Sequence, residues 1–515
     1  MSDIETILTA ARVRREAGEW SAAARLYNMA DDLNSGSFET KHNLALCHLG
    51  LGAHAEALRY SRDALSIKPD LWQSRIIQAK VLRAEGSIEE AAQALQPILK
   101  HDPLNGHALL ALADIEMNEF GDPLSAISRV APLRQSGEHQ SDAMLTTLMA
   151  KLYDRDETDE EISDQLRSFS SHALRMPGFE FDKATSGGVA NNRGRLRVGL
   201  LSPLFCASPV YYFTIGALRL LSREVDLIVF NRGTRVDWAT RAFRTVAREW
   251  HQVQHLPAEA LANAIKRQSI DVLFDLGGWM DPVGLKALSV KPAKRLYKWV
   301  GGQSATTGLD VFDGFISDIE QSPIEMQNLY SEPLINIPGG YVSYQPDFDP
   351  ADLPAPNSQD SYDFPLGIIG NPVKISRAFL TNLDARLDYV RGNILLIDRR
   401  YKISRSQERI RDGLSPRNRL RLIFLAPDSH KNYLAQIRRP RRILDTFPYN
   451  GGLTSVEAMF MSKSVETRSG KLFASRHTTS HSRFIRAEIY TPDDIRKKHQ
   501  NLAVSLKELI LHACV

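Results

Sequence analysis

The segment RLRVGLLSPLF (195–205) decides the fold of the larger part of this chain. It is a short apolar run, which is the pattern of a strand buried on both faces of a parallel sheet. A helical stretch follows and ends with ALRLLSR (217–223), after which EVDLIVFN (224–231) reads as a strand and WATRAFRTVAREW (238–250) as a helix. This alternation predicts parallel βαβ units in a doubly wound sheet.

The alternation continues toward the C-terminus on both sides of one polar segment. Further strand-like runs occur at 271–278, 312–318, 364–371, 393–399 and 419–427. The polar segment, QPDFDPADLPAPNSQDSY (345–362), is rich in Pro, Asp and Ser, which is typical of a linker. We therefore predict two similar α/β lobes, over 195–345 and 363–515, joined by a linker at 346–362.

The first third of the chain repeats every 34 residues. This period is kept by Gly18, Gly52 and Gly86, by Ala23, Ala57 and Ala91, and by Pro69 and Pro103. A fourth unit, with Ala113 and Ala126, contains one inserted residue. Small residues let paired helices approach closely, and Pro ends the second helix because it lacks an N–H. The pattern predicts a tetratricopeptide-like α-solenoid over 1–185. Such an array either binds a peptide or protein or has a purely structural role, packed against the neighbouring domain.

Composition excludes several classes of protein. The 515 residues include 64 Lys and Arg against 61 Asp and Glu, which argues against a dedicated nucleic-acid binder. Three cysteines without metal-ligand spacing indicate a reducing compartment, and we expect a cytoplasmic protein without metal. The sequence has neither the roughly 18 consecutive apolar residues of a membrane span nor an N-terminal signal peptide. Phosphate-loop and dinucleotide-binding glycine motifs are also missing, which disfavours ATPases and dehydrogenases.

A set of segments in fixed order points to one family. These are RLRVGLLSPLF (195–205), DVLFDLGGW (271–279), KPAKRLYKWVGG (291–302), SPIEMQNLYSE (322–332), GNPVKI (370–375), HKNYLAQIR (430–438), LDTFPYN (444–450) and GKLFASR (470–476). Together with the repeats they resemble the O-linked N-acetylglucosamine transferase and SPINDLY-like family, glycosyltransferase family 41, over essentially the whole chain. The resemblance implies a two-lobed, Rossmann-like GT-B fold. It also implies inverting transfer from a UDP-linked sugar, N-acetylglucosamine or a variant, to Ser or Thr of a protein, without metal or cofactor.

The resemblance places Lys374 on the family's catalytic lysine. Its ammonium would neutralise charge that develops on the departing diphosphate. Asn371, three residues earlier on a strand-to-helix turn, is placed to bond the phosphate or the ribose. The alternative is a surface lysine at a helix start, where a cation is unfavourable unless an anion lies nearby.

Two further segments match the family's donor site. His430 and Tyr433 fall where the family binds uracil, and the Tyr433 ring would stack on the base or else pack under its helix.

The segment GGLTSVEAM (451–459) opens a helix, and its glycines together with a hydroxyl predict a phosphate cradle formed by Gly451, Gly452 and Thr454. Glu457 stands where the family has an Asp that bonds ribose hydroxyls. Thr454 and Glu457 also fit a capping box.

The chain departs from the family at its histidines. The family's His-Thr-Thr motif reads Gly452, Leu453, Thr454 here, and we do not expect HTT (477–479) to replace it, because it directly follows FASR. Near the first strand, Ser208 stands for a family histidine.

Tyr212 replaces the family's next histidine, so the general base stays open. Asp275, Tyr212 and a phosphate oxygen of the donor are the candidates, and geometry must choose among them. The loop GGQSATTG (301–308) either lines the acceptor side or is only a flexible turn. Retention of Lys374 favours an enzyme, whose acceptors we expect by analogy among bacterial proteins. Loss of the histidines favours a changed donor or a non-catalytic scaffold.

Overall fold

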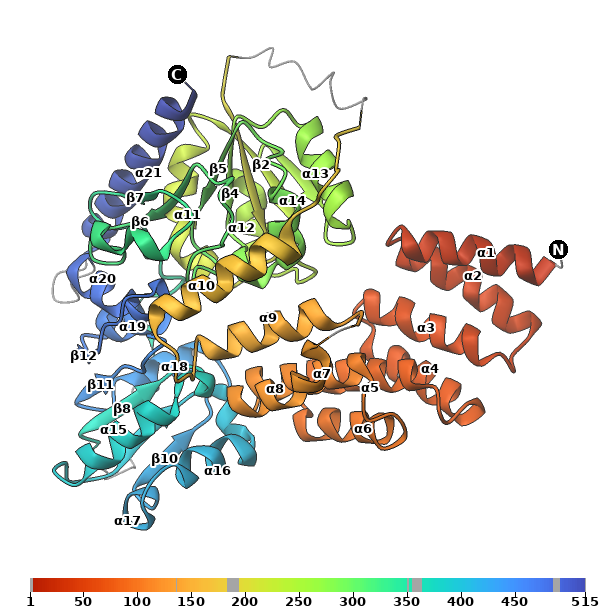
Figure 1. Ribbon diagram of the computed structural model, residues 1–515, viewed down its shortest axis with the longest axis horizontal. Coiled ribbons are helices and arrows are strands. Elements are labelled where there is room, and N and C mark those ends of the chain that lie inside the picture. The colour runs from red at the N-terminus through yellow and green to blue at the C-terminus, as the bar shows by residue number, and fades with distance from the viewer. Residues whose placement is uncertain are drawn as a thin grey trace. The chain divides into compact units, whose positions relative to one another are not determined.

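The structure, a computed structural model, describes residues 3–135, 137–182, 194–349, 352–353, 364–484 and 491–514. The chain divides into two compact units, Met1–Ala150 and Lys151–Val515. Figure 1 shows the helices of the first unit in red to orange and the α/β second unit in yellow to blue. Among the helices within these ranges, none is long and apolar enough to cross a bilayer.

The first unit is built from paired helices. They are α1 (Asp3–Glu16), α2 (Trp20–Leu33), α3 (Phe38–Gly50), α4 (His54–Ile67), α5 (Trp72–Glu85), α6 (Ile88–His101), α7 (Gly106–Asn118), α8 (Pro123–Val130) and α9 (Gln140–Lys151). Gly18, Gly52 and Gly86 have φ of 73°, 71° and 87°, the left-handed conformation that each turn between paired helices requires. The alanines of the repeat are fully buried, which confirms the predicted repeat and explains why these positions are small.

The boundary between the two units lies earlier than predicted. We assigned residues 1–185 to the repeats, but α10 (Asp159–Phe169) and the helical turn after it pack within the second unit. Ser163 donates a hydrogen bond to the Leu329 carbonyl, and Ser170 Oγ donates to the Thr307 carbonyl over 2.6 Å. Tertiary contacts therefore decide this boundary, and they have no local sequence signal. The sequence of residues 184–195 is polar, which predicts a linker between the two units, and it falls largely outside the described residues.

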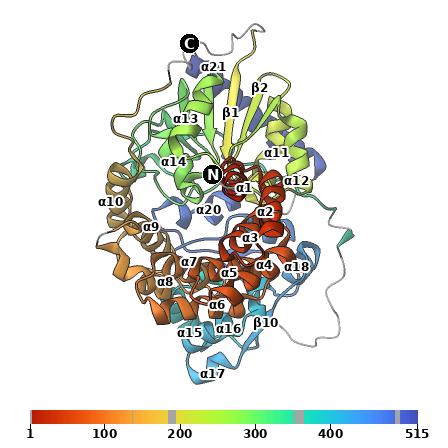
Figure 2. The same ribbon diagram turned by 90° about the vertical axis from the view of Figure 1, so that its right-hand side faces the viewer.

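The first lobe of the second unit is a seven-stranded parallel sheet with strand order β3-β2-β1-β4-β5-β6-β7. Its strands are β1 (Arg197–Ser202), β2 (Asp226–Asn231), β3 (Glu249–Gln252), β4 (Val272–Asp275), β5 (Arg295–Lys298), β6 (Gly314–Ser317) and β7 (Leu334–Asn336). Its helices are α11 (Pro209–Leu221), α12 (Trp238–Val246), α13 (Ala258–Arg267) and α14 (Pro282–Leu288), and Figure 2 shows them beside β1 and β2. The expected doubly wound sheet is confirmed.

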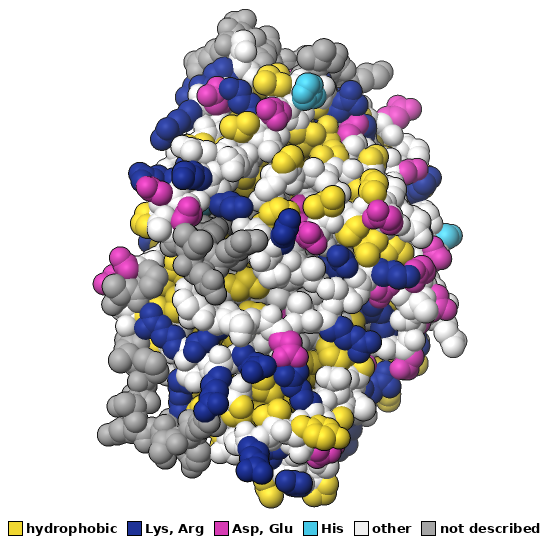
Figure 3. Space-filling model, turned by 90° about the vertical axis from the view of Figure 1, so that its left-hand side faces the viewer, with side chains coloured by type: hydrophobic (Ala, Val, Ile, Leu, Met, Phe, Trp, Pro, Cys, Tyr) yellow, Lys and Arg dark blue, Asp and Glu magenta, His cyan; other side chains and the backbone are white. Residues whose placement is uncertain are grey.

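The second lobe is a five-stranded parallel sheet with strand order β10-β9-β8-β11-β12. Its strands are β8 (Leu366–Ile369), β9 (Ile394–Ile397), β10 (Leu422–Leu425), β11 (Arg442–Leu444) and β12 (Val465–Glu466). Its helices are α15 (Arg377–Leu387), α16 (Ser404–Asp412), α17 (Pro416–Arg419), α18 (His430–Ile437), α19 (Leu453–Phe460) and α20 (His477–Phe484). Lys and Arg side chains gather over the lower part of the face drawn in Figure 3.

The last helix belongs to a different lobe than predicted. We placed all of 363–515 there, but α21 (Pro492–Cys514) returns to the first lobe. Leu502, Leu506 and Ile510 of α21 are buried in the same apolar cluster as α11, and Lys507 pairs with Glu224 at 3.1 Å. Most of the predicted linker at 346–362, namely residues 350–351 and 354–362, lies outside the described residues. The two lobes are thus connected by the chain more than once.

Candidate functional site

The second-lobe sheet reverses its strand order between β8 and β11, and ligands of doubly wound sheets bind beside such a reversal, at the carboxyl ends of the strands. The chain leaves β8 through Gly370 to Lys374, and it leaves β11 through Asp445 to Gly452. Two of the segments that the sequence singled out therefore meet at this edge.

Lys374 ends a short 3-10 turn after β8, with its side chain half-buried. Its Nζ donates a hydrogen bond to the Asn450 carbonyl over 2.7 Å and lies 4.5 Å from the centroid of the Tyr449 ring. Burial lowers the pKa of Lys374 to about 8, against the opposing effect of the Asp445 carboxylate. The ammonium is mostly charged at neutral pH, and only one of its three donors is used by a described residue.

Arg409, on α16, holds the turn that carries Lys374. Its guanidinium donates to the carbonyls of Ile375, over 3.0 Å, and Pro372, over 2.7 Å. Asn371 supports the same turn, because its Oδ1 accepts the Val373 N–H over 3.1 Å. The side-chain oxygen of Asn371 is therefore used by the turn. A contact of Asn371 with phosphate or ribose stays a prediction, and it would be made by the amide nitrogen.

Tyr449, whose ring lies next to the Lys374 ammonium, is itself held by two contacts. Its ring stacks on Tyr153 with centroids 4.7 Å apart, and its hydroxyl lies 2.9 Å from Ser304 Oγ. Ser304 belongs to the loop 301–308, which is not a free turn. The hydroxyls and amide of the two threonines in this loop donate to the buried Glu332 carboxylate. Both lobes thus contribute to the environment of the lysine.

Asp445, the first residue after β11, organises the loop that follows it. One of its oxygens accepts the N–H groups of Thr446, over 2.9 Å, and Gly451, over 2.7 Å. The other accepts the hydroxyls of Thr467, over 2.9 Å, and Thr478, over 2.6 Å. Sequence reasoning missed Asp445, although an acid directly after a strand at the reversal point is a usable signal.

The segment His477–Thr478–Thr479, which we set aside, does reach this site. It opens α20, and Thr478 Oγ1 contacts Asp445, Ser455 Oγ at 2.7 Å and the Gly451 carbonyl at 3.1 Å. It reaches the site because α20 folds back onto the start of α19.

The glycines before α19 leave the N-terminus of this helix uncovered. Gly452 is the N-cap residue, and a Cβ added there would meet nothing within 4 Å. A Cβ on Gly451 would lie 2.3 Å from Ser455 Oγ, so only glycine fits. Thr454 lies inside the helix, with its side chain next to Gly370. The predicted capping box is wrong, because the helix begins before Thr454 and Glu457 has another partner.

The partner of Glu457 is His430. The two belong to a polar group with Tyr212 and Asp347, which is distinct from the group around Lys374 and Asp445. The Nε2 atom of His430 lies 2.6 Å from Glu457 Oε1, and its Nδ1 lies 3.5 Å from the Tyr212 hydroxyl, which donates to Asp347 over 3.1 Å. Thr454 and Glu457 are three residues apart on α19 and so share a helix face, which makes the two groups neighbours. Burial alone would lower the pKa of His430, but the hydrogen bond to Glu457 and the carboxylates of Glu457 and Asp347 raise it.

Replacing Glu457 by glutamine should lower the pKa of His430. Glutamine has a similar shape but removes the negative charge, so burial, which disfavours the imidazolium, has less opposition. The fraction of charged His430 at pH 7 should fall. Titration of the His430 ring signals by NMR measures this, with Asn432→Ala on the exposed surface of α18 as the control. An unchanged or higher pKa would show that Glu457 does not control the charge of His430.

Tyr433 lies on the same helix as His430 but packs inward. Its half-buried ring joins the apolar cluster of Leu434, Ile437 and Ile443. Its hydroxyl is buried without a hydrogen-bond partner among the described residues. The structure favours the packing alternative over stacking on a nucleobase, which stays untested.

The Tyr433→Phe variant should be more stable than the wild type by about 1 kcal/mol. The change removes a buried hydroxyl whose desolvation is not repaid and keeps the ring that packs. Urea unfolding of the full chain measures the difference, and nucleotide affinity should stay the same. A loss of stability would mean that the hydroxyl has a partner.

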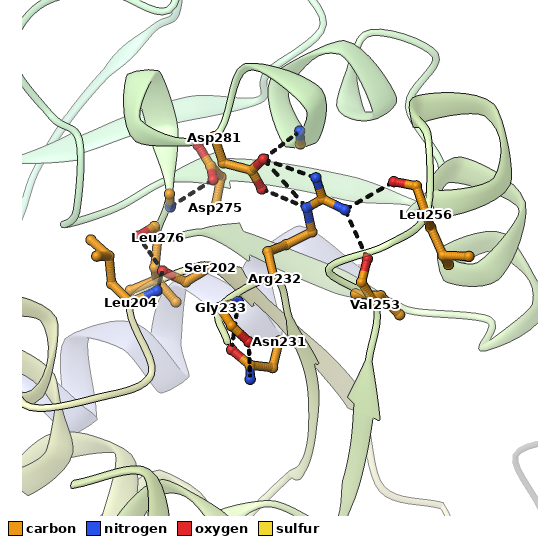
Figure 4. Close-up of polar contacts among 12 residues, drawn as sticks. Ser202, Leu204, Asn231, Arg232, Gly233, Val253, Leu256, Asp275, Leu276 and Asp281 are labelled. Atoms are coloured by element: carbon orange, nitrogen blue, oxygen red, sulfur yellow. Dashed lines mark hydrogen bonds and ion pairs between the residues drawn. The ribbon is translucent and has the colours of Figure 1, made fainter. Parts of the chain in front are cut away.

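Asp275, a predicted base, lies at the end of β4 in the first lobe (Figure 4). Its carboxylate accepts the N–H groups of Gly277, over 2.9 Å, and Gly278, over 3.0 Å, and pairs with the buried Lys298 at 3.3 Å. Neither Asp275 nor Tyr212 forms a hydrogen bond or ion pair with Lys374 within the described ranges. Their geometry argues against either as a base beside the lysine.

The strand reversal of the first lobe, between β1 and β4, is satisfied by its own polar groups. Arg232 pairs with Asp281 at 3.0 Å and donates to the Val253 carbonyl over 2.7 Å, while Ser202 Oγ donates to the Leu276 carbonyl over 2.7 Å (Figure 4). Among the described residues at the two reversal points, the lysine that keeps unused donors beside a helix N-terminus is Lys374, in the second lobe.

Comparisons with known proteins bear on the family and the fold of the chain. The sequence model of glycosyl transferase family 41 matches residues 170–344. The probable UDP-N-acetylglucosamine–peptide N-acetylglucosaminyltransferase SPINDLY of Solanum lycopersicum is 23% identical over 395 residues, 70% of this chain and 41% of that protein. Its counterpart in Arabidopsis thaliana is 25% identical over 54% of this chain and 31% of its own length. The chain thus spans less than half the length of these relatives.

A solved structure of a mutant O-GlcNAc transferase from Thermobaculum terrenum is 22% identical and has a TM-score of 0.57. The match covers 99% of this chain and 92% of the chain in that structure, and it supports the predicted fold of helical repeats followed by an α/β part.

Proposed function

We propose that this chain is a member of glycosyl transferase family 41 and transfers a sugar from a nucleotide-sugar donor to Ser or Thr of a protein. The observation that carries the proposal is the ammonium of Lys374, fixed beside the uncovered N-terminus of α19 at the strand reversal of the second lobe. A positive group and free N–H donors at one edge suit a diphosphate.

In the proposed reaction, Lys374 stabilises the charge that appears on the diphosphate when the bond to the sugar breaks. The N–H groups at the start of α19 hold the phosphates, and the hydroxyl of Thr454 adds a donor. His430 and Glu457 face the nucleoside. We propose UDP-linked N-acetylglucosamine or a variant as the donor, with no metal or cofactor, and a protein acceptor that the repeats help to bind. From the cysteine content we propose a cytoplasmic setting.

A thermal-shift panel of UDP, GDP and CMP sugars on the full chain tests the donor site. A ligand that binds only the folded state at 100 times its dissociation constant adds about 2.7 kcal/mol of stability. We expect one nucleotide class to stabilise the chain, and a Lys374→Ala variant to respond more weakly. A chain that no nucleotide sugar stabilises would contradict the proposal.

A second function is favoured by one observation. Asp275 and Tyr212, the predicted bases, are both engaged in hydrogen bonds elsewhere. A protein-binding scaffold without catalysis would retain the repeats and lobes but need no base. It predicts partner capture by the full chain without any sugar transfer in the presence of the nucleotide sugar that binds.

A further inference from the structure

His477 lies at the start of α20, beside the ring that contacts Lys374. The residue is 9% exposed, and the centroid of its ring lies 6.2 Å from that of Tyr449. It is also in ring contact with Phe473, at 5.2 Å, and with His481 on the next turn of α20, at 6.1 Å. No other histidine contacts the Tyr449 ring among the described residues, so His477 is the imidazole next to the proposed phosphate site.

The contact with Gln321 favours one tautomer of His477. Its Nδ1 lies 3.3 Å from Gln321 Oε1 and 3.3 Å from the Tyr341 hydroxyl. The amide of Gln321 is oriented by Nε2, which donates to the Phe473 carbonyl over 2.6 Å, so Oε1 faces the imidazole. A carbonyl oxygen only accepts, and Nδ1 therefore carries the proton. The lone pair is on Nε2.

The Nε2 atom of His477 is the free edge of the ring. It forms no hydrogen bond with any residue in the described parts of the chain, and, unlike Nε2 of His481, it is not fully enclosed. A neutral imidazole held by its Nδ1–H, with an unused lone pair on Nε2, is the arrangement of a general base.

We infer that Nε2 of His477 is the general base that takes the proton from the acceptor hydroxyl. The inference rests on the proposed function. The hydroxyl oxygen of Ser or Thr attacks the anomeric carbon as its proton passes to Nε2, and a new C–O bond forms. The bond from that carbon to the diphosphate oxygen breaks, and its electron pair leaves with the diphosphate beside Lys374. The proton on His477 returns to solvent after release of the products.

The electrostatics of the site fit this cycle. Burial lowers the pKa of His477 well below its ordinary value, and His481 and Lys374 add to the effect, so the free ring is neutral. The charged or titratable groups around it are Lys374, Tyr341, Tyr449 and His481, with Asp318 and Asp445 one hydrogen bond further. A bound diphosphate brings negative charge beside Lys374. It should therefore raise the pKa of His477 and make the ring a better proton acceptor when substrate is present.

The His477→Asn variant tests the assignment in the full chain. Asparagine retains an N–H donor toward Gln321 but has no basic nitrogen at the position of Nε2. Transfer from the donor that binds, to a library of Ser and Thr peptides, should fall by about 100-fold or more, the usual contribution of a general base. Affinity for UDP should change less than twofold. The control is Ser482→Ala, on the exposed surface of α20, which should transfer within about threefold of the wild type.

A second measurement does not depend on turnover. NMR titration of the His477 ring, with and without saturating UDP, should show a higher pKa in the complex. Equal transfer by His477→Asn and the wild type would overturn the inference and leave the proposed function intact. Absence of transfer by the wild type would count against the proposed function. In that case the titration still decides, because UDP that binds without shifting the His477 pKa would overturn the assignment.

Discussion

Replacing Lys374 by alanine should lower sugar transfer by about 100- to 1000-fold, the contribution of a preorganised electrostatic contact to a developing charge. The ammonium is held 2.7 Å from the Asn450 carbonyl and against the Tyr449 ring, so it does not need to be recruited during the reaction. It stabilises the departing diphosphate more than the bound donor, and the loss should therefore appear in kcat. Transfer is measured by intact-mass spectrometry of the acceptor.

Two controls separate charge from structure. Lys374→Arg should recover little activity, because a planar guanidinium cannot reproduce a compact ammonium at this position. The melting temperature of Lys374→Ala should stay near or above that of the wild type, since a half-buried cation costs desolvation energy. Normal turnover in a folded alanine variant would defeat the assignment.

The pH profile offers a check without mutation. The pKa of Lys374 is lowered to about 8, and the charged form is the active one. Since kcat/KM reports the free enzyme, it should decrease as pH rises through about 8. A profile that stays flat up to pH 10 would mean that the ammonium of Lys374 is not required.

Asp445→Ala should lower the free energy of unfolding of the second unit by about 3–5 kcal/mol. The buried carboxylate accepts four hydrogen bonds, and its removal leaves the N–H groups of Thr446 and Gly451 without their acceptor. Each buried donor left without a partner costs about 1–3 kcal/mol. The loop before α19 should also lose its shape, so nucleotide affinity should fall together with stability.

The matched control for this prediction is Asp445→Asn. Its amide keeps one oxygen acceptor and the size of the side chain, so the loss of stability should be clearly smaller than for alanine. Urea unfolding and UDP binding are measured for both variants. Equal stability of Asp445→Ala and the wild type would contradict the role of Asp445 in organising the loop.

The strands and the repeat could be read from sequence because their signals are local. A buried parallel strand is a short apolar run, and the repeat returns glycine and alanine at fixed intervals. The helix predicted over WATRAFRTVAREW (238–250) ends too late, because a local pattern does not show where strand pairing takes over. We predicted helix throughout, but α12 ends at Val246 and β3 begins at Glu249, where pairing with β2 outweighs the helical pattern.

The positions of α10 and α21 had no local signal. Whether α21 packs on the first or the second lobe depends on which apolar surface it meets, and its own pattern only shows that one face is apolar. The same holds for α10, whose Ser163 bonds a carbonyl that lies far away in the sequence.

In the candidate site, too, some residues could be predicted from the sequence and others could not. Lys374 and the glycines before α19 follow strands directly, so sequence order was enough to bring them together. Tyr449 and His477 gain their roles from neighbours that are distant in sequence, such as Tyr153 and Gln321. Such contacts cannot be read from one sequence.

Hydrogen exchange of the full chain, with and without the nucleoside diphosphate that gives the largest thermal shift, tests the central claim most directly. If the site lies at the strand reversal of the second lobe, the ligand should slow exchange in residues 370–376 and 445–456. Protection confined to the repeats or to the strand ends of the first lobe, with the ligand bound, would contradict the account.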